Sequence, residues 1–315
     1  MIKRWFAALV LALGLVIAPP PASAQTEAQL QELIAWATPL TDIQTRVQVA
    51  VRSVTAVSRA ARQAQTTEGM VAILRAGQPT IRAARAELRA LRAELDALPP
   101  FESPNVDERV VRLTDIALSE TRNTIDLFDG AIADVEQLLP AFERNDVEEL
   151  TRLANRLVMF TANFMRSQAN TLRVAQLQIP VHDPLHHING ARAEMMDSLY
   201  AVLTISNASD ASAVTAATAR ARVWVASGRA ALREERARYL SLGDTRITAL
   251  QDVNERQLDA LDAFIIDVDT ATNRLSPSTP APQRIELLRA LGEHDRLLQQ
   301  LSAQGGALAA QAGRR

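Results

Sequence analysis

The chain has 315 residues, of which 48% are hydrophobic and 4% aromatic, and it carries 34 Lys and Arg residues against 36 Asp and Glu. This near balance of charge gives no electrostatic case for nucleic-acid binding. The sequence contains no cysteine, which excludes disulfides, thiolate nucleophiles and iron–sulfur clusters.

Residues 1–24 have the pattern of a secretory signal peptide. Lys3 and Arg4 precede an apolar run, and Ala22-Ser23-Ala24 forms an A-x-A cleavage site. The run is too short to span a bilayer as a stable helix, although an uncleaved membrane anchor is the alternative interpretation. We therefore expect cleavage after Ala24 and a periplasmic or secreted mature protein without a transmembrane span.

Glycine and proline are few in the mature region and lie mostly between apolar segments of helical periodicity, which predicts an all-α fold of long amphipathic helices. A short lead helix is predicted over 25–40, ending before Pro39. The first long helix then starts at the cap Asp42. The next, over 66–98, contains Gly77-Gln78-Pro79, which predicts a kink or a split.

Four long helices form the predicted first unit, residues 41–179. Pro140 is expected to end the third helix, and Asn145 or Asp146 to cap the fourth. The four helices are predicted over 42–65, 66–98, 106–139 and 147–178.

A second unit over 180–304 is predicted to repeat this plan. Pro39-Leu40-Thr41-Asp42 recurs 141 residues later as Pro180-Val181-His182-Asp183, and apolar positions and helix-ending prolines then match in both halves. This pattern predicts two tandem antiparallel four-helix bundles in an elongated molecule. The alternative is one longer helical array without internal symmetry. Residues 305–315, rich in alanine and glycine, are expected to be a disordered tail.

Basic and acidic helices alternate in both predicted units. Five arginines in 66–98 precede eight acidic residues in 105–139, and six arginines in 209–242 precede seven acidic residues in 243–276. Short connections make such helices antiparallel neighbours, so their edges of opposite charge should face each other. The arginine stripe of the first basic helix is therefore predicted to be bridged rather than to bind anions. It comprises Arg82, Arg85, Arg89 and Arg92.

Histidines cluster at the start of the second unit and suggest a metal site. His182 and His186 have the i, i+4 spacing with which two imidazoles can share a metal on one helical face, and Glu194 follows closely. The first unit has no equivalent residues. The alternative is that these histidines are exposed or cap the helix locally.

Four polar residues fall on apolar helix stripes, namely Thr121, Thr124, Glu235 and Asn254. Burial of Glu235 without a partner is costly, so this residue needs a partner or a wet seam between helices. The four residues either line a small-ligand pocket or set the register of the helices.

The sequence contains no glycine-rich phosphate loop, nucleophile elbow or EF-hand loop, so neither an enzyme nor a cofactor is predicted. We expect an exported structural or interaction module: a periplasmic spacer, adaptor or envelope-associated factor that contacts an envelope protein or itself. The alternative is a soluble, sensor-like bundle that binds a small ligand or metal. In architecture alone, tandem four-helix bundles resemble the extracytoplasmic sensor domains of bacterial chemoreceptors.

Overall fold

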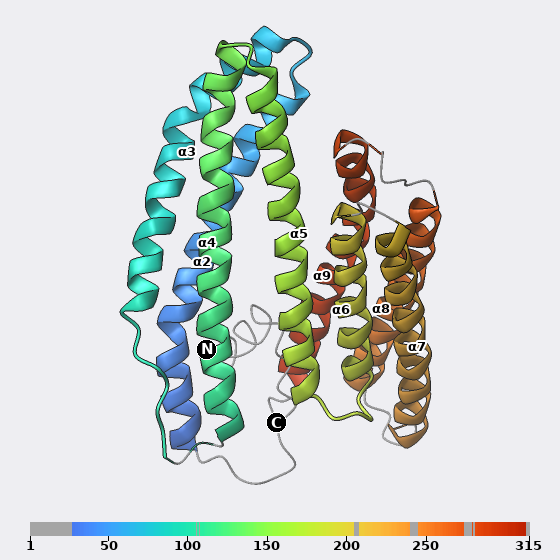
Figure 1. Cartoon of the computed structure of the whole chain (residues 1–315). Coiled ribbons are helices and arrows are strands. Elements are labelled where there is room, and N and C mark those ends of the chain that lie inside the picture. Colours follow the sequence, from blue (N-terminus) through green and yellow to red (C-terminus); the bar gives the residue numbers. More distant parts are fainter. Residues whose placement is uncertain are drawn as a thin grey trace. The chain divides into compact units, whose positions relative to one another are not determined.

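The computed structural model describes residues 27–104, 106, 108–204, 208–239, 245–273, 279 and 281–312, so the predicted signal peptide lies outside the described residues. Within them all regular secondary structure is helical, which confirms the predicted all-α fold. None of the described helices has the length and apolarity that a membrane span requires. The helices are α2 (Glu27–Gln63), α3 (Thr67–Asp96), α4 (Glu108–Glu143), α5 (Val147–Gln178), α6 (Pro184–Thr204), α7 (Ala208–Tyr239), α8 (Thr245–Thr272) and α9 (Ala281–Ala312) (Figure 1).

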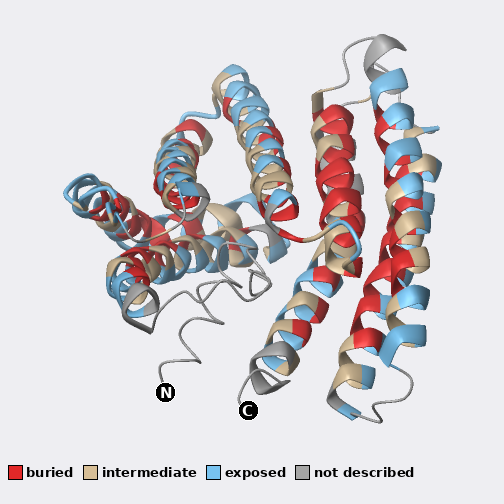
Figure 2. Cartoon of the chain, turned by 90° about the horizontal axis from the view of Figure 1, so that it is seen from below, coloured by how far each residue is buried: buried red, intermediate tan, exposed pale blue. Residues whose placement is uncertain are grey.

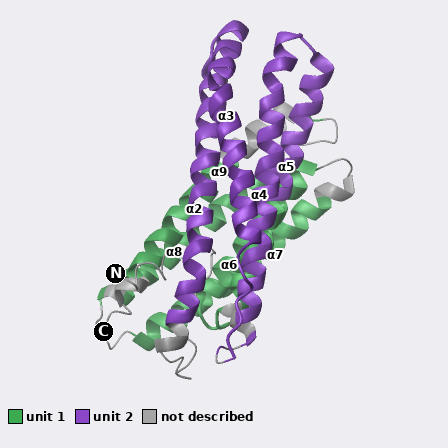
Figure 3. Ribbon diagram, turned by 90° about the vertical axis from the view of Figure 1, so that its left-hand side faces the viewer, with its two compact units in different colours: residues 1–23, 165–315 green, residues 24–164 purple. Residues whose placement is uncertain are grey.

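The helices form two compact units, a purple N-terminal unit of residues 24–164 and a green C-terminal unit that includes residues 165–315 (Figure 3). The border lies within α5, not at 179/180 as predicted. It does so because Ala169 and Leu172, near the end of α5, belong to the hydrophobic cluster formed by α6 to α9. The two units therefore differ in their helix content.

Helix α2 runs through Pro39, so the expected end of a lead helix at this residue is wrong. Pro39 is exposed, whereas Ala37 and Leu40 on either side are buried, so one buried face continues past the proline. The Thr38 hydroxyl donates to the carbonyl of Ile34 at 2.7 Å, one turn earlier. Burial of a continuous face outweighs the single backbone hydrogen bond that the proline removes.

Other predicted helix ends differ in the same direction. Helix α3 continues through Pro79 without a split, and α4 continues past Pro140 to Glu143. The expected disordered tail is also wrong, because α9 extends to Ala312. Gly305 is buried, and Leu308 packs against the hydrophobic cluster of the C-terminal unit, which keeps this segment helical.

The predicted starts of α3, α5 and α6 are confirmed, because a side chain accepts a backbone N–H at each. The three bonds run from Gly69 N to Thr66 Oγ1 at 3.0 Å, from Glu149 N to Asp146 Oδ1 at 3.0 Å, and from Leu185 N to Asp183 Oδ1 at 2.9 Å. Each satisfies a donor that the first helical turn leaves free.

The predicted pairing of basic and acidic helices is confirmed inside each unit. The arginine stripe of α3 is bridged to α4 by Arg82–Glu136, Arg85–Asp129, Arg89–Asp129 and Arg92–Asp126, at 3.0–3.4 Å. Helices α7 and α8 are bridged by Arg222–Asp269, Arg229–Asp259 and Arg236–Glu255. In both ladders the residue numbers rise along one helix as they fall along the other, so the helices are antiparallel.

The two ladders do not share the register that the predicted duplication requires. Arg85 and Arg229 are equivalent in the alignment of the two halves, and Arg85 pairs with Asp129. Arg229 pairs with Asp259 and Asp262, which align with positions 122 and 125. Position 122 lies about two helical turns from Asp129. The structure therefore does not confirm a tandem duplication.

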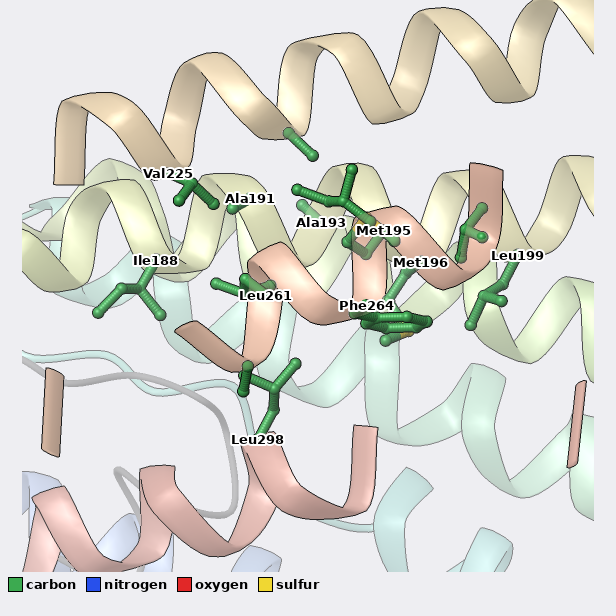
Figure 4. Packing of buried hydrophobic residues seen from close by; sticks show 14 of the residues in the cluster. Ile188, Ala191, Ala193, Met195, Met196, Leu199, Val225, Leu261, Phe264 and Leu298 are labelled. Carbon is green, nitrogen blue, oxygen red and sulfur yellow. The ribbon is translucent and has the colours of Figure 1, made fainter. Parts of the chain in front are cut away.

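Helix α6 forms the centre of the C-terminal unit. No residue of α6 is exposed, whereas the other helices show a buried and an exposed face (Figure 2). Met195 and Met196 of α6 lie in one cluster with Phe264 of α8, and Leu298 of α9 points toward Leu261 (Figure 4). A helix buried on all sides carries its polar residues into the core, where each needs a partner.

Candidate functional site

The predicted metal ligands His182, His186 and Glu194 are not brought together. His182 is exposed, and His186 Nδ1 lies 2.9 Å from the carbonyl oxygen of Ile179 and 3.1 Å from that of Gln176, so it donates to the end of α5. No group of three histidine or acidic side chains within the described residues is arranged to hold a metal ion. His186 therefore acts as a local cap for free carbonyl groups.

Glu194 is buried and belongs to an ion-pair network instead. Its Oε2 lies 2.8 Å from an arginine nitrogen of Arg220 on α7, and its Oε1 lies 3.4 Å from Arg173 on α5. Arg173 also pairs with Asp197. Glu194 thus joins α5, α6 and α7, and its acceptor positions are committed to guanidinium groups.

The four predicted pocket residues are divided between the units, two in each. In the N-terminal unit, buried Thr121 donates to the carbonyl of Ala117 at 2.7 Å and accepts from Gln44 Nε2 at 3.0 Å, while Thr124 is half-buried. Thr121 therefore links α2 to α4 as a satisfied polar contact. This agrees with the register-setting alternative.

Asn254 belongs to a buried polar chain that joins α6, α8 and α9. Arg192 Nη1 donates to Ser302 Oγ at 3.0 Å, Ser302 Oγ donates to Gln257 Oε1 at 3.1 Å, and Gln257 Nε2 lies 3.5 Å from Asn254 Oδ1. Asn254 and Gln257 are only 2% and 1% exposed. Arg192 Nε has no hydrogen-bond partner, and burial lowers the pKa of Arg192, with Asp295 opposing the shift.

Glu235 belongs to a second polar group, which we call the acid end: Asp183, Glu235 and Gln251. These residues lie where α6 begins, α7 ends and α8 begins. Glu235 Oε2 is buried without a hydrogen-bond partner, and Gln251, 5% exposed, has an Nε2 that meets no acceptor at hydrogen-bond geometry. Unsatisfied buried atoms of this kind are uncommon in folded proteins and require an explanation.

Burial raises the pKa of both carboxyl groups of the acid end. For Glu235 the negative charge of Asp183 adds to the effect of burial, while Arg238, Gln251 and Arg236 oppose it. For Asp183 the N–H of Leu185 and the nearby histidines oppose the effect of burial. The native structure therefore favours the uncharged carboxyl at both positions.

Two histidines and a tryptophan line the interior next to the acid end. The ring centroids of His186 and His187 are 5.2 Å apart, and each lies within 6 Å of the Trp224 ring. Gly190 makes this packing possible, because a Cβ there would lie 2.8 Å from Trp224 Cδ2 and 2.7 Å from Gln176 Nε2. His187 Nδ1 is buried without a hydrogen-bond partner, and burial lowers the pKa of His187.

Sequence reasoning identified Glu235 and Asn254 but missed their neighbours Gln251, Gln257 and Arg192. The two glutamines follow the apolar stripe of α8 at a spacing of three residues around Asn254, so the same criterion could have found them. Arg192 gave no such signal, because α6 has no polar face from which it could stand out.

No protein-family model, curated protein or solved structure is significantly similar to this chain. The chemistry of the site follows from its own residues. The acid end offers two carboxyl groups of raised pKa and an amide, a combination suited to taking up a proton.

Proposed function

We propose that this chain is an exported helical-bundle protein that works through contacts with other proteins in the bacterial periplasm, as a spacer, adaptor or envelope-associated factor, and not as an enzyme. The observation that carries the proposal is the use of charge: in both units, arginine–acid ladders hold neighbouring helices in register. Helices of 28 to 37 residues, about 42–55 Å long, surround α6. Such ladders fix geometry more than they add stability, as a scaffold requires.

The corner between α5 and α6 is where we expect a partner to bind. Leu177 at the end of α5 is 78% exposed and Val181 in the following turn is 67% exposed, while Ile179 between them is buried. Apolar side chains held at a fixed corner are suited to a protein contact.

Site-specific photo-crosslinking in the native envelope tests this proposal. A photoreactive residue at Leu177 or Val181 should give a discrete adduct with one envelope protein or with a second copy of the chain. The same residue at the exposed Glu148 of α5 serves as the control. Equal, diffuse labelling at all three positions would argue against a contact at this corner.

Export is tested separately, because it depends on residues 1–24 alone. Cell fractionation should recover the protein in the periplasm or medium with Gln25 as its first residue. A chain that retains residues 1–24 in the membrane fraction would support the uncleaved anchor.

A second candidate, a soluble sensor-like bundle that binds a small ligand, is favoured by the polar chain around Asn254. Arg192 is half-buried, and its Nε lacks an acceptor, so the guanidinium could be completed by a small carboxylate. Thermal unfolding with a panel of small organic acids tests this. A rise in Tm that is lost in Arg192→Gln would favour ligand binding over a scaffold role.

A further inference from the structure

We propose that Glu235 is a proton-binding switch that sets how firmly the acid end of the C-terminal unit is closed. The proposal is independent of the function proposed above. It starts from geometry: Glu235 Oε2 is buried without a donor, although α7 places it between the start of α6 and the start of α8.

A charged carboxylate is poorly accommodated at this position. Its buried oxygen has lost water and gains no hydrogen bond in return, which disfavours the ionised form. A protonated carboxyl carries no charge and has a hydrogen-bond donor of its own. Proton uptake therefore removes the unfavourable burial and relieves repulsion from Asp183.

The groups around Glu235 leave this imbalance in place. Asp183 comes from the turn before α6, together with His182, His186 and His187, and Gln251 comes from α8. Arg236 and Arg238 of α7 favour the charged form, but Arg236 is committed to Asp252 at 3.1 Å and Glu255 at 2.9 Å, and Arg238 is exposed. From α9, Gly305 lies against Val253 of α8 and supplies no charge.

The direction of the pH effect follows from the raised pKa of Glu235. The native state holds a proton that the unfolded chain has already released, so the contribution of Glu235 to stability is complete below the ordinary glutamate pKa. It is lost as pH rises through the native pKa. His187 acts in the opposite direction: because its pKa is lowered, its contribution falls as pH drops below the ordinary histidine range. A comparison of variants is therefore needed to isolate Glu235.

Thermal unfolding of the mature chain from about pH 8 to about pH 5 tests the switch. Glu235→Gln mimics the protonated state, and at pH 8 it should raise Tm above wild type by about 2–4 °C. The two proteins should converge as pH falls. Glu234→Gln is the matched control, since Glu234 is the adjacent, exposed residue and should follow wild type at every pH.

Hydrogen exchange at pH 8 supplies the local readout. The amides of 232–239 and 247–254 should exchange faster in wild type than in Glu235→Gln, while those of α3 should not differ. If Glu235→Gln folds poorly, Asp183→Asn provides a second route, because an asparagine still caps α6 and the loss of the charge should move the wild-type transition to lower pH.

Three results would overturn the proposal. One is a Glu235→Gln curve that lies parallel to wild type, which would make the residue structural only. Another is unchanged exchange at the acid end. The third is a rise in wild-type Tm with calcium or magnesium at pH 8 that Glu235→Gln abolishes, which would make the acid end a cation site.

Discussion

Gly77 of α3 gives the sharpest test of the packing in the N-terminal unit. A Cβ at this position would lie 2.3 Å from Val57 Cγ1, 3.1 Å from Cγ2 and 3.3 Å from Cβ. Valine on a helix is held in one rotamer, so Val57 cannot rotate away. The substitution Gly77→Ala therefore forces α2 and α3 apart.

The magnitude follows from two opposing terms. Alanine in place of glycine within a helix contributes about 1 kcal/mol. An overlap that displaces a packed helix costs about 2–3 kcal/mol, the upper part of the range for overpacking. Gly77→Ala should thus lower the free energy of unfolding by about 1–2 kcal/mol.

Gly130 of α4 is the matched control, since no atom lies within 4 Å of a Cβ built there. Gly130→Ala should stabilise the protein by about 1 kcal/mol, in urea unfolding followed by circular dichroism. The double variant Gly77→Ala/Val57→Ala should be more stable than the sum of its single variants by about 1–2 kcal/mol. The reasoning fails if Gly77→Ala stabilises as Gly130→Ala does, or if the double variant shows no coupling.

Three further predictions concern charge, capping and metal. Arg85→Ala should lower the free energy of unfolding by about 1 kcal/mol, and Arg112→Ala by close to zero, because Arg112 is exposed and pairs only within its own helix; equal losses in urea unfolding would contradict the ladder. Asp146→Ala should cost about 1 kcal/mol and Asp146→Asn much less, and a similar loss for both would rule out a capping role. Added zinc should leave the wild-type Tm unchanged, since His186 and Glu194 already have partners, whereas a zinc-dependent rise lost in His186→Ala would restore the metal site.

Local chemistry could be predicted from the sequence, because it depends on residues one turn apart. Asp146 and Asp183 accept N–H groups two or three residues ahead, as capping chemistry requires. The pairing of basic and acidic helices was also predictable, since short connections leave few alternatives to an antiparallel neighbour. The register of each ladder was not, because sliding by two turns preserves the pattern of charges.

Features that depend on tertiary packing escaped sequence reasoning. Pro39 ends a helix by its own chemistry, yet the buried face of α2 continues across it. Glu194 looked available for a metal because its partners, Arg173 and Arg220, lie 21 and 26 residues away. The orphan oxygen of Glu235 likewise arises from three separate helix ends. A buried acid on an apolar stripe was visible in the sequence, but its surroundings were not.

The passage of α5 through both units has a practical consequence. Limited proteolysis should find no susceptible loop at the border near residue 164, since the backbone there is helical on both sides. A gene fragment cut at this border would leave a severed rod on each product, and a cut at the turn near 180 would strip Ala169 and Leu172 from the second product. Expression and inheritance of either half alone are thus disfavoured by the same helix.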